Sequence, residues 1–193
     1  MTTKLDAEYR KEGFHWGLNP SSAVKNILHL KSQGTVLDIG VGEGRNALFL
    51  AQNGFAVTGI DISEEGIKKF TQEAQKRGLH VHGIVADITT AELEKYDVIL
   101  AINLLQFLTK EKAYATIEKM KKHAEPDGIN IIQVFLKENQ GSFPYLFSKD
   151  ELKTLYSDWD ILLYKEYETP KEKHGNGPWH HHYVAEIITK RKN

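Results

Sequence analysis

The sequence predicts an α/β fold built on a doubly wound, mostly parallel sheet of seven strands with an antiparallel last strand. Short apolar runs alternate with longer amphipathic stretches, and several runs are apolar on both faces, as buried strands are. Only a loop rich in glycine and proline separates the last two runs, so they should pair antiparallel. The expected strands are Thr35–Ile39, Ala56–Ile60, Val81–Val85, Tyr96–Ala101, Ile129–Leu136, Ile161–Tyr167 and Tyr183–Thr189.

The helices between these runs have recognisable ends. Ser63–Arg77 begins at a serine that can cap it, has Glu64 and Glu65 in its first turn, and ends before Gly78. Its apolar residues fall on one face, which should be buried. The other expected helices are Ser21–Leu30, Asn46–Asn53, Thr109–His123 and Ser148–Tyr156.

The length of 193 residues favours a single domain over residues 1–193. Residues 1–34 precede the first strand and should form a helical cap. Residues 35–193 should form a Rossmann-like core. We expect a monomer or a homodimer.

Composition excludes several partners. The chain has 25 Lys and Arg against 26 Asp and Glu, which predicts no nucleic-acid partner and no anionic membrane surface. No apolar run reaches the roughly 18 residues of a membrane span, and the first residues lack the apolar core of a secretory signal. Cysteine is absent, which excludes a thiolate nucleophile and favours a cytoplasmic location.

A glycine-rich turn follows the first expected strand in "VLDIGVGEGRN". Gly40, Gly42 and Gly44 let the backbone turn sharply and let a ligand approach it. Dinucleotides use G-x-G-x-x-G and S-adenosylmethionine uses G-x-G-x-G. The dinucleotide spacing from Gly40 would need glycine at position 45, which is Arg45. Asp61, at the end of the second strand, can accept both ribose hydroxyls of either ligand.

Polar residues lie at the carboxyl ends of four successive strands: Asp38 and Asp61 close the first two, Asp87 follows the third and Asn103 follows the fourth. Ligands of open α/β sheets bind at this carboxyl edge. An ordinary role in capping turns remains the alternative for Asp87 and Asn103.

These motifs resemble those of class I S-adenosylmethionine-dependent methyltransferases over roughly residues 34–189. The segments concerned are "VLDIGVGEGRN", "GIDIS", "VADI" and "YDVILAINLLQFL". Within that class, "GEGRNALFLAQNGFAVTGIDIS" and "GPWHHHYVAEIITKRK" resemble the small tellurite-resistance methyltransferases of the TehB type.

The resemblance implies a role for each matching residue. Gly40, Gly42 and Gly44 would bring backbone against the methionine portion of the cofactor, and Asp38 would help to hold its ammonium group. Asp61 would bind the ribose diol, and Asp87 the adenine amino group. The resemblance further implies that the adenine ring packs against Ile62 and Ile88, and that the sulfonium lies over Asn103 and Leu104.

Histidines gather at the start of the last strand, which an antiparallel course would bring to the carboxyl edge. We predict His180 and His181 as catalytic residues, and His174, His15, Trp16 and Tyr145 as acceptor contacts. Structural imidazoles and simple packing are the alternatives. No metal site is expected, because only His180 and His182 could share a face of the strand.

The predicted activity is methylation of a small molecule such as tellurite, selenite or a thiol. The chain reads "NLLQ" after the fourth strand and lacks the proline pair usual in enzymes that methylate adenine or glutamine amides. Two alternatives are a non-catalytic S-adenosylmethionine-binding regulatory protein and an NAD-dependent oxidoreductase.

Overall fold

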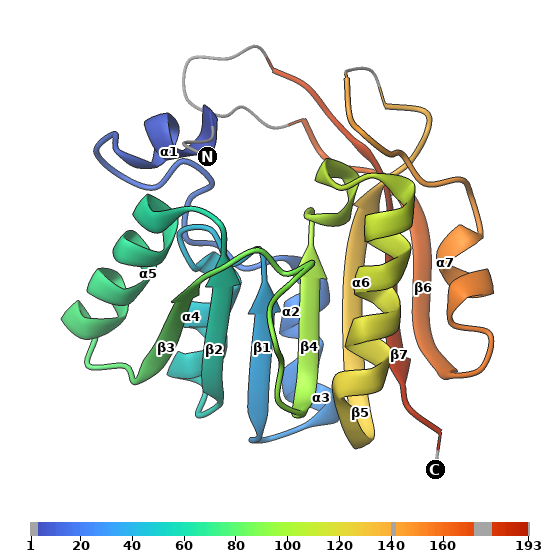
Figure 1. The fold of residues 1–193 in the computed structure, drawn as a ribbon, viewed down its shortest axis with the longest axis horizontal. Helices are drawn as coiled ribbons and strands as arrows, with labels where there is room; N and C mark the ends of the chain where they lie inside the picture. Colours follow the sequence, from blue (N-terminus) through green and yellow to red (C-terminus); the bar gives the residue numbers. More distant parts are fainter. Residues whose placement is uncertain (1–3, 140–141, 172–178, 193) are drawn as a thin grey trace. The chain divides into compact units, whose positions relative to one another are not determined.

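The computed structural model describes residues 4–139, 142–171 and 179–192. The strands follow one another in the order β3-β2-β1-β4-β5-β7-β6 (Figure 1). Strand β7 runs antiparallel to both β5 and β6. The pairs β1–β2, β2–β3 and β4–β5 are parallel. This confirms the predicted mostly parallel seven-stranded sheet. The chain divides into two compact units, residues 1–93 and 94–193, which we describe in turn.

The first unit contains three parallel strands and two main helices. The strands are β1 (Thr35–Ile39), β2 (Ala56–Asp61) and β3 (Val81–Val85), and the helices are α4 (Arg45–Gln52) and α5 (Glu64–Lys76). The Ser63 hydroxyl caps α5 by accepting from the Gly66 N–H at 3.0 Å, as the sequence predicts. Helix α5 packs on β2 and β3 (Figure 1).

Phe70 of α5 is fully buried and fills the space left by two glycines. A Cβ atom at Gly44 would lie 2.2 Å from its ring, and one at Gly59 would lie 2.8 Å from it. The absent side chains therefore let α5 approach both the glycine-rich turn and β2. One aromatic ring thus couples the helix to the turn that follows β1.

The N-terminal segment differs from its prediction. The expected helix Ser21–Leu30 is two short helices, α2 (Ser22–Lys25) and α3 (Ile27–Leu30), with Asn26 between them. A further helix, α1 (Lys4–Tyr9), was not predicted. Its six residues are too few to show a clear helical period, and it packs against α5.

The second unit contains the other four strands. These are β4 (Tyr96–Ile102), β5 (Ala124–Phe135), β6 (Asp160–Glu168) and β7 (Tyr183–Lys190). The helical elements are the 3-10 turn η1 (Leu105–Phe107), α6 (Lys110–His123) and α7 (Glu151–Leu155). Strand β5 begins five residues before the predicted Ile129, because α6 runs directly into it and the pairing with β4 shifts register between Tyr96 and Val98.

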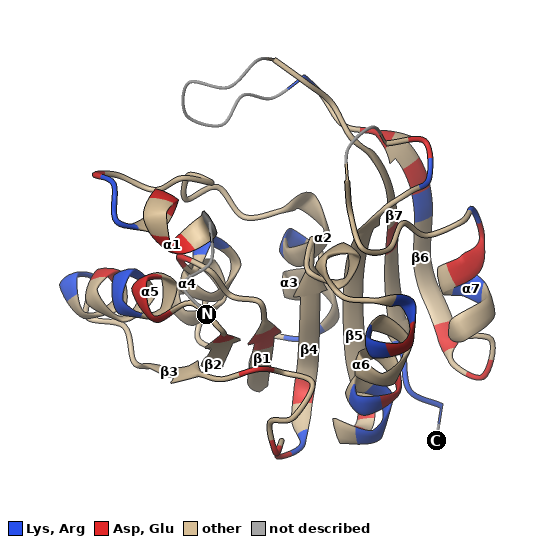
Figure 2. Cartoon of the chain, turned by 45° about the horizontal axis from the view of Figure 1, so that its top comes forward, with Lys and Arg blue, Asp and Glu red and all other residues tan. Residues whose placement is uncertain are grey.

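Charged residues of both signs alternate along α5 and α6 (Figure 2). Examples are the pairs Arg77–Glu73 at 2.8 Å at the end of α5 and Lys121–Glu118 at 3.6 Å on α6. Both signs of charge therefore occur on each helix. Among the helices of the described residues, none combines the length and apolar character needed to cross a bilayer.

Replacing Phe70 with alanine should lower the free energy of unfolding by about 3–5 kcal/mol, because it empties a fully buried aromatic site. Phe107→Ala is the matched control, since that ring is 50% exposed and its loss should cost less than about 1 kcal/mol. Urea denaturation of both variants measures the difference. Equal losses of unfolding free energy in the two variants would contradict the conclusion that Phe70 couples α5 to the glycine-rich turn.

Candidate functional site

The glycine-rich turn of the first unit is left-handed at all three glycines. The φ angles are 72° at Gly40, 53° at Gly42 and 90° at Gly44. The N–H groups of Gly40 and Val41 both donate to the Ile60 carbonyl, at 2.8 and 3.1 Å. Residues other than glycine rarely adopt such backbone angles. The three glycines are therefore needed for the turn itself.

The glycines also make room for the protein's own atoms. A Cβ atom at Gly42 would lie 2.9 Å from the hydroxyl of Tyr9, which reaches over from α1. Burial raises the pKa of that phenol, and its oxygen accepts from the Trp16 indole N–H at 3.2 Å. The sequence predicts that these glycines let a ligand approach the backbone. That explanation is incomplete, because Tyr9 and Phe70 occupy the space that side chains at Gly42 and Gly44 would need.

Asp61 connects the turn to the next helix. Its Oδ2 accepts from the Gly42 N–H at 2.8 Å, and its Oδ1 accepts from the Ser63 N–H at 2.9 Å. Burial raises the pKa of this carboxyl, whereas these two donors lower it. A carboxylate has about four lone-pair sites, so each oxygen can accept a further hydrogen bond from a ligand hydroxyl.

Asp38 lies at the end of β1 and is 2% exposed. Burial raises its pKa to about 7, and the charge of Asp61 contributes to the rise. Arg45 and the Ala47 N–H, both on α4, oppose it. A buried carboxylate with a raised pKa is stabilised by a nearby cation, so the chemistry of this position suits a ligand ammonium group.

The carboxyl ends of β2 and β3 carry the next group of predicted residues. Asp87 Oδ1 accepts from the Thr89 N–H at 2.8 Å, so the residue does cap a turn. Ile88 is 6% exposed and belongs mainly to the core, whereas Ile62 is 47% exposed. Val85, also 47% exposed, is an apolar residue at this edge that sequence reasoning missed.

Glu43, between two of the turn glycines, anchors the N-terminal segment. Its Oε2 accepts from the His15 N–H at 2.7 Å, and its Oε1 pairs with Lys69 at 2.9 Å. The His15 ring lies against Trp16 with 4.5 Å between centroids. The structure thus brings both predicted acceptor contacts of this segment to the glycine-rich turn. The backbone N–H groups of His15 and Trp16 both donate to Glu43, a residue that sequence reasoning did not single out.

In the second unit, polar side chains follow the end of β4. Asn103 has a left-handed φ of 56°, and its N–H donates to the Gln133 carbonyl at 2.9 Å. Its Oδ1 and both amide atoms of Gln106 are buried with no hydrogen-bond partner among the described residues. Leaving such groups unpaired costs about 1–3 kcal/mol each. Gln106 follows the predicted Leu104 by two residues and is a candidate ligand contact that the sequence alone did not reveal.

The consecutive histidines before β7 point in different directions. His181 Nε2 lies 3.1 Å from a Glu168 oxygen, whereas the rings of His180 and His182 meet with 4.9 Å between centroids. His182 also stacks on Phe135 at 4.2 Å. Of the two predicted catalytic histidines, His181 therefore lies on the other side from His180. His174 lies outside the described residues.

Tyr145, a predicted acceptor contact, belongs to a packed polar network. Its hydroxyl donates to Glu151, which also accepts from Tyr114 at 2.8 Å. Burial and this carboxylate raise the pKa of Tyr145. Its ring packs on Phe147 with 4.8 Å between centroids. These contacts support the packing alternative for Tyr145.

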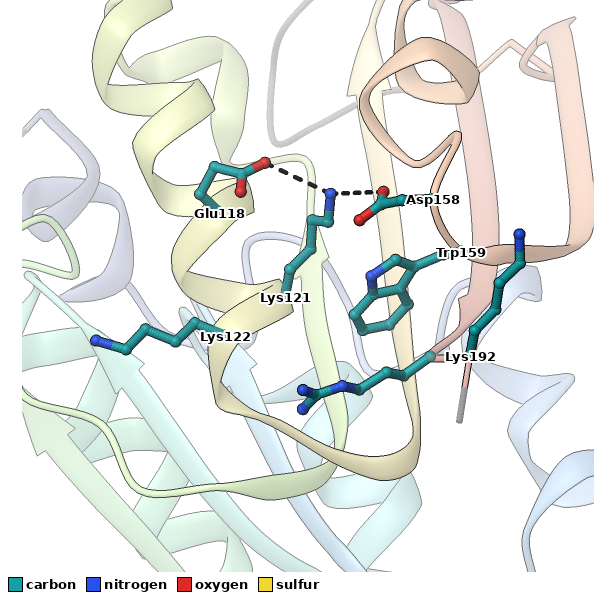
Figure 3. A pocket seen from close by; sticks show the side chains of 7 residues that line it. Glu118, Lys121, Lys122, Asp158, Trp159 and Lys192 are labelled. Atoms are coloured by element: carbon teal, nitrogen blue, oxygen red, sulfur yellow. Dashed lines mark hydrogen bonds and ion pairs between the residues drawn. The ribbon is translucent and has the colours of Figure 1, made fainter.

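A surface pocket of about 360 Å³ lies elsewhere on the second unit (Figure 3). It lies between the C-terminal half of α6 and the end of β7, and Trp159 forms part of its wall. Lys121 reaches between Glu118 and Asp158, at 3.6 and 2.7 Å (Figure 3). Because β7 is antiparallel to β5, its end lies at the amino edge of that strand, so this pocket is not at the carboxyl edge.

Methyltransferases of known structure share this fold. Magnesium protoporphyrin IX methyltransferase from Synechocystis PCC 6803, solved with bound S-adenosylmethionine, has a TM-score of 0.70 at 21% identity, covering 88% of this chain and 76% of that chain. TehB from Haemophilus influenzae has a TM-score of 0.81 at 28% identity, covering 97% of this chain and 66% of that chain. The architecture is therefore that of class I methyltransferases.

A family model described as "Tellurite resistance protein TehB" matches residues 6–176. The chain belongs to the TehB family, which confirms the resemblance seen in the sequence. A probable S-adenosyl-L-methionine-dependent methyltransferase TehB of Haemophilus influenzae (strain ATCC 51907 / DSM 11121 / KW20 / Rd) is 34% identical over 136 residues, 68% of this chain and 48% of that protein. The chain thus spans about half the length of this relative.

The buried carboxyl of Asp38 should make stability depend on pH. Its pKa is raised from 3.8 to about 7 on folding, so its contribution is complete below about pH 4 and is lost as the pH rises to about 7. Asp38→Asn should therefore lose less free energy of unfolding between pH 5 and pH 7 than the wild type. Denaturation at several pH values tests this, with exposed Glu92→Gln as the control. Parallel curves for Asp38→Asn and wild type would contradict it.

Gln106→Leu should raise the free energy of unfolding by about 1–3 kcal/mol, because it removes a buried amide that lacks partners. Gln75→Leu on the exposed face of α5 makes the same chemical change and should stay within about 0.5 kcal/mol of wild type. Thermal and urea unfolding measure both. A marked loss of stability in Gln106→Leu would show that the amide is bonded in the folded protein.

Proposed function

We propose that this chain is a cytoplasmic S-adenosylmethionine-dependent methyltransferase that acts on a small molecule. The observation that carries the proposal is the Asp61 carboxylate bonded to the Gly42 N–H at 2.8 Å. This contact holds a carboxylate beside a left-handed glycine-rich turn at the carboxyl edge of parallel strands, where nucleosides bind in such sheets, and this supports a ribose-binding role for Asp61.

The residues of the first unit fit the parts of this cofactor. Asp61 has lone pairs for two ribose hydroxyls, and the buried Asp38 suits the ammonium group. Ile62 and Val85 present apolar surface for the adenine ring, and Asp87 would accept from its amino group. Family membership supports this assignment, since the related protein of Haemophilus influenzae carries the cofactor in its name.

The family resemblance assigns Asn103 and Leu104 to the reacting end of the cofactor. Asn103 and Leu104 follow β4, and the unpaired Asn103 Oδ1 and Gln106 amide suit a polar ligand. When bound, S-adenosylmethionine supplies a methyl group already activated by the sulfonium charge. The protein then has to align the acceptor with that methyl group and exclude water, which together can lower the barrier by about 7–11 kcal/mol.

The acceptor is a small molecule in this proposal. Tellurite, selenite and thiols are the acceptors predicted from the sequence, and the family name supports tellurite. No nucleic-acid or membrane partner is proposed, in keeping with the net charge of −1.

Asp61→Asn should weaken S-adenosylmethionine binding by about 10- to 100-fold, because it replaces charged hydrogen bonds to the ribose with neutral ones. Asparagine is preferable to alanine, since its side-chain oxygen can still accept from Gly42 or Ser63. Isothermal titration calorimetry measures the affinity, with Glu92→Gln as the matched acidic control. Wild-type affinity in a folded Asp61→Asn protein would refute the assigned cofactor site.

A further inference from the structure

The surface pocket beside α6 carries more positive than negative charge. We name this pocket of about 360 Å³, between α6 and the end of β7, the α6 pocket (Figure 3). Its volume lies in the range of small-molecule sites, about 300–1,000 Å³. Four cations line it against two carboxylates, which leaves an excess of two positive charges on a chain whose net charge is −1. The cations are Lys121, Lys122, Arg191 and Lys192.

Both carboxylates of the α6 pocket are paired with the same cation. Lys121 Nζ lies 2.7 Å from Asp158 and 3.6 Å from Glu118, and it also donates to the Leu155 carbonyl at 3.2 Å (Figure 3). The Lys121 side chain is 14% exposed, whereas both carboxylates are more than half exposed. The negative charge is therefore gathered around Lys121, and the excess positive charge belongs to the other three cations.

Arg191 is held in place by the backbone of β5. Its N–H donates to the Gly128 carbonyl at 2.9 Å, and its Nη1 donates to the Ala124 carbonyl at 2.7 Å. No carboxylate among the described residues forms an ion pair with it. A guanidinium has five N–H donors in a planar fork, so one bond to a carbonyl leaves donors for an oxyanion. Because the group is already fixed, little conformational freedom would be lost on binding.

Lys122 and Lys192 add positive charge without a strong partner. Lys122 is exposed, and none of the residues that the structure describes bonds to its ammonium group. Lys192 Nζ lies 4.0 Å from Asp160, and both side chains are more than half exposed. An exposed pair at this distance is weak. An anion bound to Arg191 would therefore find two ammonium groups able to turn toward it.

Trp159 adds an aromatic surface to the α6 pocket. Its ring packs edge-on against Tyr156 with 5.5 Å between centroids, and its backbone N–H donates to the Tyr156 carbonyl at 3.0 Å. These contacts fix the indole, whose nitrogen lies on the side toward Lys121 (Figure 3). Within the described ranges no group accepts from the indole N–H. A ligand in the pocket would meet an apolar ring edge beside the cations.

We propose that the α6 pocket binds a small organic phosphate monoester. Arg191, Lys122 and Lys192 hold the phosphate, and the organic part lies against Trp159. The pocket is at the amino edge of β5, whereas Asn103 follows the carboxyl end of the parallel strand β4. The inference therefore goes beyond the proposed function and does not rest on it.

Charge and shape favour a phosphate monoester over other anions. Such a group carries about −1.5 to −2 charges at pH 7, which matches the excess of two positive charges, whereas a carboxylate carries one. Its three terminal oxygens can accept from the guanidinium fork and from both ammonium groups together. Inorganic phosphate has the charge but would leave the Trp159 edge uncovered, so an ester with an apolar group should bind more tightly.

The test uses the full chain and phenyl phosphate, which has no ribose or adenine and so does not resemble the cofactor. In proton–nitrogen-15 spectra, Trp159→Phe identifies the Trp159 indole signal. Phenyl phosphate should shift this signal saturably and leave those of Trp16 and Trp179 unchanged. Calorimetry should give a dissociation constant below about 1 mM. Titrations with and without S-adenosylhomocysteine should agree, so that failure of the proposed function would not conceal binding here.

Substitutions in the α6 pocket should weaken binding in a graded way. Arg191→Gln should lower the affinity for phenyl phosphate by about 10-fold or more, because it removes charge-assisted hydrogen bonds. Lys122→Gln should lower it by about 2- to 5-fold, and it leaves the fold intact because Lys122 bonds to no described residue. Lys165→Gln removes the same charge on β6 outside the pocket and should bind as the wild type does.

Several results would overturn the proposal. A Trp159 signal that does not respond to phenyl phosphate across the millimolar range would exclude the site. Benzoate binding as tightly as phenyl phosphate would overturn the phosphate class, and inorganic phosphate doing so would overturn the organic part. Unchanged affinity in a folded Arg191→Gln protein would show that Arg191 only fastens the end of β7 to β5. If that variant does not fold, an equal loss in Lys122→Gln and Lys165→Gln would show non-specific attraction and refute the site.

Discussion

The hydrogen bond from the Gly42 N–H to Asp61 is the contact on which the first unit depends. Asp61 also accepts from the Ser63 N–H, so one carboxylate joins the turn after β1 to the start of α5. Both donors would otherwise be backbone groups at the ends of elements, which need partners. The same carboxylate keeps lone pairs for a ligand. Under the proposed function, the Asp61 carboxylate would serve both the fold and the ligand.

The site also carries costs that a purely structural design would avoid. Asp38 is a buried acid with a pKa raised to about 7, and Asn103 and Gln106 bury polar atoms without partners among the described residues. Each arrangement is unfavourable in the folded protein alone. Under the proposed function, a ligand would supply the missing charge or hydrogen bond at each of these positions.

The histidines before β7 show how local geometry changes the meaning of a sequence feature. Three consecutive imidazoles look equivalent in the sequence, and alternation along an extended chain separates them only into two sides. Contacts far apart in sequence distinguish His182 from its neighbours. Asn139 is 43 residues away and Phe135 is at the end of β5, so no local pattern could reveal them.

The sequence by itself determined the strands, the helices of the core, the turn glycines and the family, because these depend on periodicity, capping and backbone angles within short segments. Ser63 as a cap and Gly44 as a left-handed residue are examples. Only the tertiary structure decided that α1 covers the turn with Tyr9, that Glu43 anchors the N-terminal segment, and that the Gln106 side-chain amide has no hydrogen-bond partner among the described residues. These features depend on burial and on which distant groups meet, and burial is a property of the folded chain rather than of any short segment.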